Sequence, residues 1–162
     1  MITTETFTNK QIEIVRKQYA EQGEIQPMWI AETNDGEILV LATPEYGDPA
    51  TKPAIEQVIR NLFKENEVWR YCFVFEAWFH TADSKEKIDA AIDRYGSVSQ
   101  MPERQEAINV IVEESGKMPI GHTIVITRDE NGKGHLSEKI QTSNFIHFFR
   151  GGFLPNDGLT RN

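Results

Sequence analysis

The clearest pattern in the chain is an alternation of apolar and mixed side chains over residues 69–80. Its odd positions are apolar and form one face: Trp69, Tyr71, Phe73, Phe75, Ala77 and Phe79. Its even positions bring together an acid, an imidazole and an indole: Arg70, Cys72, Val74, Glu76, Trp78 and His80. A period of two predicts a β-strand. We expect the apolar face in the core and the mixed face at solvent or at a site.

Helical periodicity predicts three helices. A capping box at Thr8–Gln11 begins the first and Gly23 ends it, Thr51 caps the second, and Ser84 and Gly96 bound the third. Their apolar stripes are Ile12, Val15 and Tyr19, then Ile55, Val58, Ile59 and Leu62, then Ile88, Ala91 and Ile92. We expect the stripe of the second helix to pack on a sheet.

Further strands are predicted on both sides of the 69–80 strand. Residues 28–33 and 37–42 flank the turn signal at Asn34–Gly36 and should form a hairpin. Residues 104–114, 119–128 and 133–140 read as a meander with turns at 115–117 and 130–132. The long connection before residue 104 allows that strand to run beside the 69–80 strand.

This order of elements predicts an α+β fold: one largely antiparallel sheet of about six strands, with the two main helices on one face. The chain of 162 residues is expected to form a single globular domain, 1–162, with a frayed tail after residue 155. The single cysteine, Cys72, allows no intramolecular disulfide and fits a reducing compartment as a small buried side chain.

The net charge is −8, from 25 acidic and 17 basic residues. This balance argues against direct nucleic-acid binding, which depends on Lys and Arg neutralising phosphates. It favours a basic partner, or it only keeps the protein soluble. The amino-terminal residues lack a signal-like pattern, and no run of 18 apolar residues occurs. We therefore expect a cytoplasmic protein without a membrane span.

Candidate chemistry gathers where residues 69–80 meet the segment 102–106. Glu76, His80 and Arg104 are the candidate catalytic residues, because a carboxylate and an imidazole four residues apart on one face of the strand could exchange a proton through one substrate. Trp78, Arg104 and Glu106 are the candidate ligand-binding residues, since the guanidinium suits a small anion. Alternatively, Arg104 only pairs with Glu76 or Glu106, and Trp78 closes over the pair.

Other chemistries find little support in the sequence. His80, His122, His135 and His147 are dispersed without a ligand motif, so we expect no metal site and no cofactor. His122 reads as a hydrogen-bonded, partly buried histidine. Gly116–Lys117 and Gly132–Lys133 lie in turns between strands and indicate hairpins rather than phosphate loops. No nucleophile motif surrounds a serine.

Large aromatic side chains gather near the carboxyl end of the chain. Either this segment docks on the protein's own sheet, or it forms an interface with a partner or a second copy. The candidate interface residues are Phe145, Phe148, Phe149 and Phe153.

Two short motifs, Glu76-Ala-Trp78 and Pro102-Glu-Arg-Gln-Glu106, carry a resemblance over about residues 69–115. The chain resembles a loose group of uncharacterised small bacterial, archaeal and phage proteins in which a strand ending in Glu-Ala-Trp precedes a Pro-x-Arg-x-Glu segment. The resemblance implies that this pairing of strands recurs as a unit. It brings no activity, substrate or cofactor with it. Met101 departs from the group's pattern, which would place a histidine before the proline.

Two hypotheses about function follow. The first is a small acidic interaction protein, of phage or mobile-element origin, that binds another protein or forms a homodimer. The absence of catalytic motifs favours it over an enzyme. The second is a small-molecule sensor or enzyme acting on an anionic ligand at Glu76, Trp78, His80 and Arg104.

Overall fold

Nine elements follow one another along the chain in the computed structural model, which describes residues 2–43, 50–79, 84–96, 100, 102, 104–144, 153 and 154. They are α1 (Thr4–Gln22), β1 (Met28–Thr33), β2 (Ile38–Ala42), α2 (Lys52–Glu65), β3 (Val68–Phe79), α3 (Lys85–Tyr95), β4 (Gln105–Glu114), β5 (Ile120–Arg128) and β6 (Gly134–Asn144). The strands form one antiparallel sheet in the order β2-β1-β3-β4-β5-β6. The α+β class and the antiparallel sheet are as predicted.

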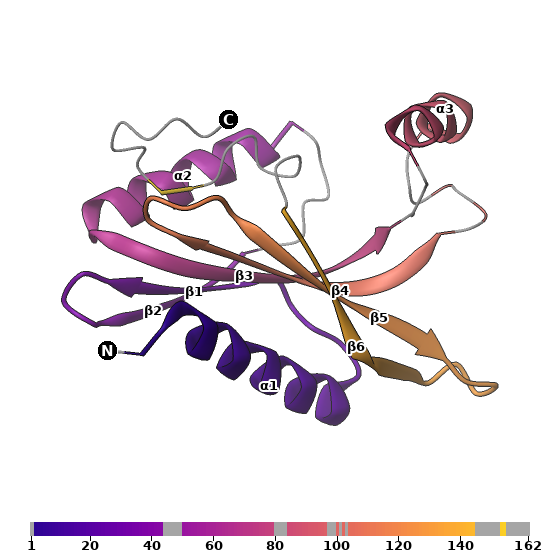
Figure 1. Cartoon of the computed structure of the whole chain (residues 1–162), viewed down its shortest axis with the longest axis horizontal. Coiled ribbons are helices and arrows are strands. Elements are labelled where there is room, and N and C mark those ends of the chain that lie inside the picture. The colour runs from indigo at the N-terminus through magenta and orange to yellow at the C-terminus, as the bar shows by residue number, and fades with distance from the viewer. Residues whose placement is uncertain are drawn as a thin grey trace.

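Helices α1 and α2 lie on opposite faces of the sheet (Figure 1). The expectation that both cover one face is therefore wrong. The reason lies in β3, whose two faces are both buried over its first half. Cys72 and Val74 point into a core under α1, whereas Tyr71 and Phe73 point into a second core under α2. Cys72 is buried as expected, and this burial raises the pKa of its thiol.

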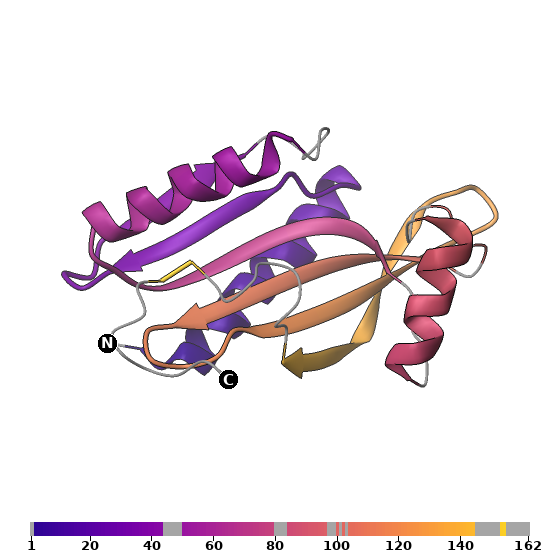
Figure 2. The ribbon, with the colours of Figure 1, turned by 90° about the horizontal axis from the view of Figure 1, so that it is seen from above.

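Helix α1 begins one turn earlier than its predicted capping box. Thr3 is the N-cap, and its side chain accepts a hydrogen bond from the Thr6 N–H. Thr8 lies inside the helix, where its hydroxyl donates to the Thr4 carbonyl at 2.7 Å. Gly23 ends the helix with φ of 73°, a left-handed conformation that glycine adopts without a steric cost. Figure 2 shows α1 running behind the sheet along its full length.

Helix α2 also turns its buried face differently from the prediction. Ile59 and Phe63 are buried, but Val58 is 56% exposed. The stripe is therefore rotated towards Phe63, whose ring packs edge-on against Trp29. Helix α3 has its predicted cap, since Ser84 accepts a hydrogen bond from the Lys87 N–H and Gly96 follows its last turn.

The pairing of β3 with β4 is the longest in the sheet and confirms the predicted adjacency. It runs from Arg70 opposite Glu114 to Phe79 opposite Gln105. Strand β1 pairs with β3 only as far as Met28 opposite Val74. The last residues of β3 therefore continue past the end of β1. This projecting end carries Glu76 and Trp78.

Candidate functional site

A groove of about 360 Å³ lies at the projecting end of β3. Its walls come from the connection between α1 and β1, from β3, and from the neighbouring ends of β4 and β5. It is lined by Ile25, Pro27, Phe73, Phe75, Glu76, Ala77, Trp78, Glu106, Ala107 and Ile126. Most of these side chains are apolar, and two are carboxylates. Three of the candidate site residues named from the sequence therefore line the groove: Glu76, Trp78 and Glu106.

Glu76 is exposed in this groove and is fixed by the backbone of the α1–β1 connection. One carboxylate oxygen accepts the Ile25 N–H at 2.9 Å. Partial burial raises the pKa of Glu76, and the nearby carboxylates of Glu106 and Glu24 raise it further. The Ile25 N–H and Arg128 act in the opposite direction without cancelling this rise. The raised pKa of Glu76 therefore reflects mainly its partial burial, with a smaller contribution from the neighbouring carboxylates.

Trp78 lies opposite Glu106 in the pairing of β3 with β4, and it is 43% exposed. The guanidinium carbon of Arg104 lies 4.7 Å from the centroid of its ring. This is a cation–π contact, which a planar guanidinium makes well over an indole. The structure thus brings Trp78 and Arg104 into contact. The partner of Glu76 on β4 is Ile108, four residues from Arg104, about 13 Å along the strand.

Glu106 pairs with Arg128, a residue that the sequence analysis did not single out. Arg128 Nε and Nη2 lie 2.6 and 3.0 Å from the two carboxylate oxygens of Glu106. Arg128 Nη1 also donates to the Gly132 carbonyl at 2.9 Å, so it ties the β5–β6 turn to this site. The sequence feature that could have pointed to Arg128 was its position at the end of its strand, on the same face as Ile126. Recognising it required the β4–β5 register, which sequence alone did not supply.

Other predicted site residues lie elsewhere or outside the described part of the chain. His80, Phe145, Phe148 and Phe149 belong to the residues that are not described. Phe153 is described and is only 2% exposed, because it packs edge-on against Trp29 inside the protein's own core. That burial leaves Phe153 no surface to offer a partner.

Phe153 and Leu154 are held in place by Glu113, a buried residue that the sequence analysis did not consider. One carboxylate oxygen of Glu113 accepts the N–H groups of Phe153 and Leu154 at 2.9 and 2.8 Å. A carboxylate bound by two backbone N–H groups is a charge-assisted anchor. Of the two alternatives for the carboxyl end, docking on the sheet holds for these two residues.

His122 matches its predicted role. It is half-buried, and its Nδ1 lies 3.1 Å from the Thr142 hydroxyl on β6. Within the described residues, no three histidine, cysteine, aspartate or glutamate side chains gather as a metal site would require. None of the helices in the same part of the chain is both long and apolar enough to cross a membrane.

Comparison of the chain with protein-family models, with curated proteins and with solved structures found no match.

Proposed function

We propose that this is a non-enzymatic interaction protein that binds a basic segment of another protein in the groove at Glu76 and Trp78. The observation that carries the proposal is the exposed Glu76 carboxylate, held in a mostly apolar groove beside an exposed indole. Lys and Arg side chains combine an apolar stem with a cationic head. Such a side chain can lay its stem against Trp78 and place its head at Glu76.

The local charge supports a cationic rather than an anionic ligand. Three carboxylates meet here, from Glu76, Glu106 and Glu24, together with the guanidiniums of Arg128 and Arg104. Arg128 is engaged by Glu106 through two hydrogen bonds. The remaining balance is negative, in line with the net charge of −8 for the whole chain. A basic partner gains from this field at long range as well as at contact.

The ring of Trp78 accepts the guanidinium of Arg104, whose central carbon lies 4.7 Å from the ring centroid, so an incoming arginine would share or displace this contact. An incoming cation would also lower the raised pKa of Glu76, because an opposite charge favours the ionised carboxylate. Binding and deprotonation of Glu76 are then linked. Affinity should rise as the pH rises through the pKa of Glu76.

The test uses fluorescence anisotropy with labelled decapeptides in which glycine alternates with arginine or, as the charge-reversed probe, with glutamate. The arginine peptide should bind the wild-type protein more tightly at pH 7 than at pH 5. Glu76→Gln should weaken this binding about tenfold and flatten its pH dependence, a loss of about 1.4 kcal/mol. Trp78→Ala should weaken it as well.

Glu13→Gln is the matched control, since Glu13 is an exposed glutamate on α1 outside the groove. Equal affinity of the wild-type protein and Glu76→Gln for the arginine peptide would overturn the proposal. Tighter binding of the glutamate peptide than of the arginine peptide would instead support an anionic ligand at Trp78 and Arg104.

A further inference from the structure

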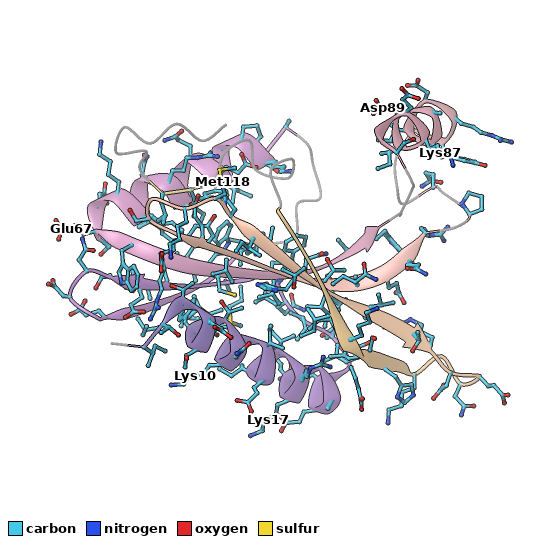
Figure 3. The ribbon with its side chains drawn as sticks, in the orientation of Figure 1. Lys10, Lys17, Glu67, Lys87, Asp89 and Met118 are labelled. Carbon is cyan, nitrogen blue, oxygen red and sulfur yellow. The ribbon has the colours of Figure 1, made fainter. Side chains whose placement is uncertain are left out.

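A second cavity, of about 460 Å³, lies between the amino-terminal half of α1 and the sheet. It is on the face that also carries Glu76 and Trp78, but shares no lining residue with their groove. The cavity is lined by Thr4, Glu5, Thr8, Asn9, Ile12, Val112, Glu114, Lys117, Met118, Ile120, His122, Ile140 and Thr142. Its volume is that of a typical small-molecule site. Figure 3 shows Lys10 and Lys17 on the opposite side of α1, pointing away from the sheet.

The inner wall of the cavity is apolar. Ile12 and Val112 are 8% and 4% exposed and belong to the core under α1, and Ile140 packs against that core. Ile120, the first residue of β5, extends this apolar wall towards solvent and is 41% exposed. An apolar molecule in the cavity would cover this aliphatic surface. That burial favours binding in proportion to the area removed from water.

Hydrogen-bonding groups stand on one side of this apolar wall. His122 and Thr142 face each other across β5 and β6, with Nδ1 of His122 3.1 Å from the Thr142 hydroxyl. Burial lowers the pKa of His122, so the ring is neutral at neutral pH and carries one donor and one acceptor nitrogen. Within the described part of the chain, His122 uses Nδ1 for its hydrogen bond to Thr142. Its other ring nitrogen, Nε2, can therefore bond to a ligand.

Two charged groups at the rim compensate each other. Lys117 Nζ lies 2.6 Å from Glu114, and the Thr4 hydroxyl donates to the same carboxylate. Partial burial acts to raise the pKa of Glu114, but the bonds from Lys117 and Thr4 outweigh it and hold the pKa below its ordinary value. Glu5 lies in the first turn of α1, where the helix dipole favours a carboxylate. Among the described residues that line the cavity, Lys117 and Glu114 therefore offset each other, and the remaining charge is that of Glu5, which is exposed at the rim.

We infer that this cavity binds an uncharged small molecule with an apolar body and one hydrogen-bonding edge, such as a hydroxyl or an amide. The apolar body lies against Ile12, Ile120 and Ile140, and the polar edge bonds to His122. A charged ligand of the same size would lose its hydration without gaining a buried opposite charge. The site is independent of the groove at Glu76.

The experiment compares three probes of one shape: benzamide, benzoate and the benzamidinium ion. Titrations are followed through the backbone amide resonances of the ¹⁵N-labelled full chain. Benzamide should shift the resonances of Ile12, Ile120 and Thr142 in a saturable manner, and bind at least fivefold more tightly than either charged probe. Absence of saturable shifts, or tighter binding of a charged probe, would overturn the inference.

Two substitutions test the location. Ile120→Phe extends a side chain into the cavity and should weaken benzamide binding at least fivefold. Ile38→Phe makes the same change on β2, on the same face of the sheet as Ile120 but outside the cavity. Ile38 is 53% exposed, and this variant should leave binding unchanged. Thr142→Val supplies a second variant that removes the hydroxyl beside His122 without adding bulk. Wild-type affinity for benzamide in both Ile120→Phe and Thr142→Val would place the ligand elsewhere and refute the site.

Discussion

Arg70 on β3 lies opposite Glu32 on β1, and its Nε lies 2.5 Å from the Glu32 carboxylate inside the protein. The guanidinium is fully buried, and Nη1 donates to the Ile2 carbonyl at 3.0 Å. The rings of Phe7 and Trp69 each lie within 4.6 Å of its central carbon. Arg70 was expected on an open, mixed face of its strand. It is buried instead, and its hydrogen bonds join the start of α1 to the sheet.

Arg70→Met should destabilise the protein by about 3–5 kcal/mol, because it leaves the buried Glu32 without its cation. Urea denaturation followed by tryptophan fluorescence measures this loss. Adding Glu32→Leu should restore part of the stability, since it removes the orphaned charge. Arg94→Met changes an exposed arginine of α3 and should have almost no effect. A loss below about 1 kcal/mol in Arg70→Met would contradict this account.

Gly134 and Tyr19 form a close contact that constrains both positions. A Cβ atom on Gly134 would lie 1.9 Å from the Tyr19 hydroxyl oxygen, so Gly134→Ala should cost about 1–3 kcal/mol by overpacking. The Tyr19 hydroxyl is buried without a hydrogen-bond partner in the described structure, so Tyr19→Phe should cost little. The double variant should be more stable than Gly134→Ala alone. Strictly additive losses in thermal denaturation would contradict the contact.

Glu113 should control how firmly the carboxyl end is docked. Glu113→Ala removes the acceptor of the Phe153 and Leu154 N–H groups, so their amide hydrogens should exchange faster with solvent. The loss of global stability should be about 1–3 kcal/mol. Glu113→Gln keeps an acceptor oxygen and should show a smaller change in both quantities. Unchanged exchange at Phe153 and Leu154 in Glu113→Ala would argue against this anchor.

Glu76 should reduce the stability of the protein at neutral pH. Its pKa is raised above 4.5 in the folded state, so the unfolded chain releases this proton at a lower pH. Stability is then lost as the pH rises from 4.5 through the raised pKa, and the loss is complete above it. Glu76→Gln can still accept the Ile25 N–H and avoids this loss. Its free energy of unfolding, relative to wild type, should increase between pH 4 and pH 7 in urea titrations; a decrease would contradict the raised pKa.

Local sequence patterns predicted the helices and strands well. They predicted less well which side of each element is buried. The β1–β2 hairpin, the cap of α3 at Ser84 and the long strand β3 were recognisable because each depends on residues close together in sequence. Strand β6 extends four residues past its predicted end. Its later residues are polar, so their pattern did not predict a strand, but β5 pairs with them as far as Asn144. Arg70 illustrates the harder case, since its burial depends on α1 and β1 and not on its neighbours along β3.

The candidate site shows the same limit. The pattern along β3 identified Glu76 and Trp78, and the contact of Trp78 with Arg104 could be anticipated from the predicted adjacency of two strands. Arg128 could not, because its pairing with Glu106 depends on the register of a third strand. The cavity at His122 was equally out of reach, since it exists only where α1 crosses three strands.

The sheet separates two sets of buried side chains that touch different helices, one set under α1 and the other under α2. A change in side-chain volume on one side reaches the other only through the backbone of shared strands such as β3. Compensating substitutions should therefore accumulate within each set and rarely across the sheet. Related chains, once aligned, should show two blocks of covarying positions. The cavity at His122 lies on the α1 side, whereas the groove at Glu76 is also lined by Phe73 and Phe75 of the α2 side. The cavity can therefore diverge in specificity while the α2 side preserves the fold, but the groove is tied to both sets.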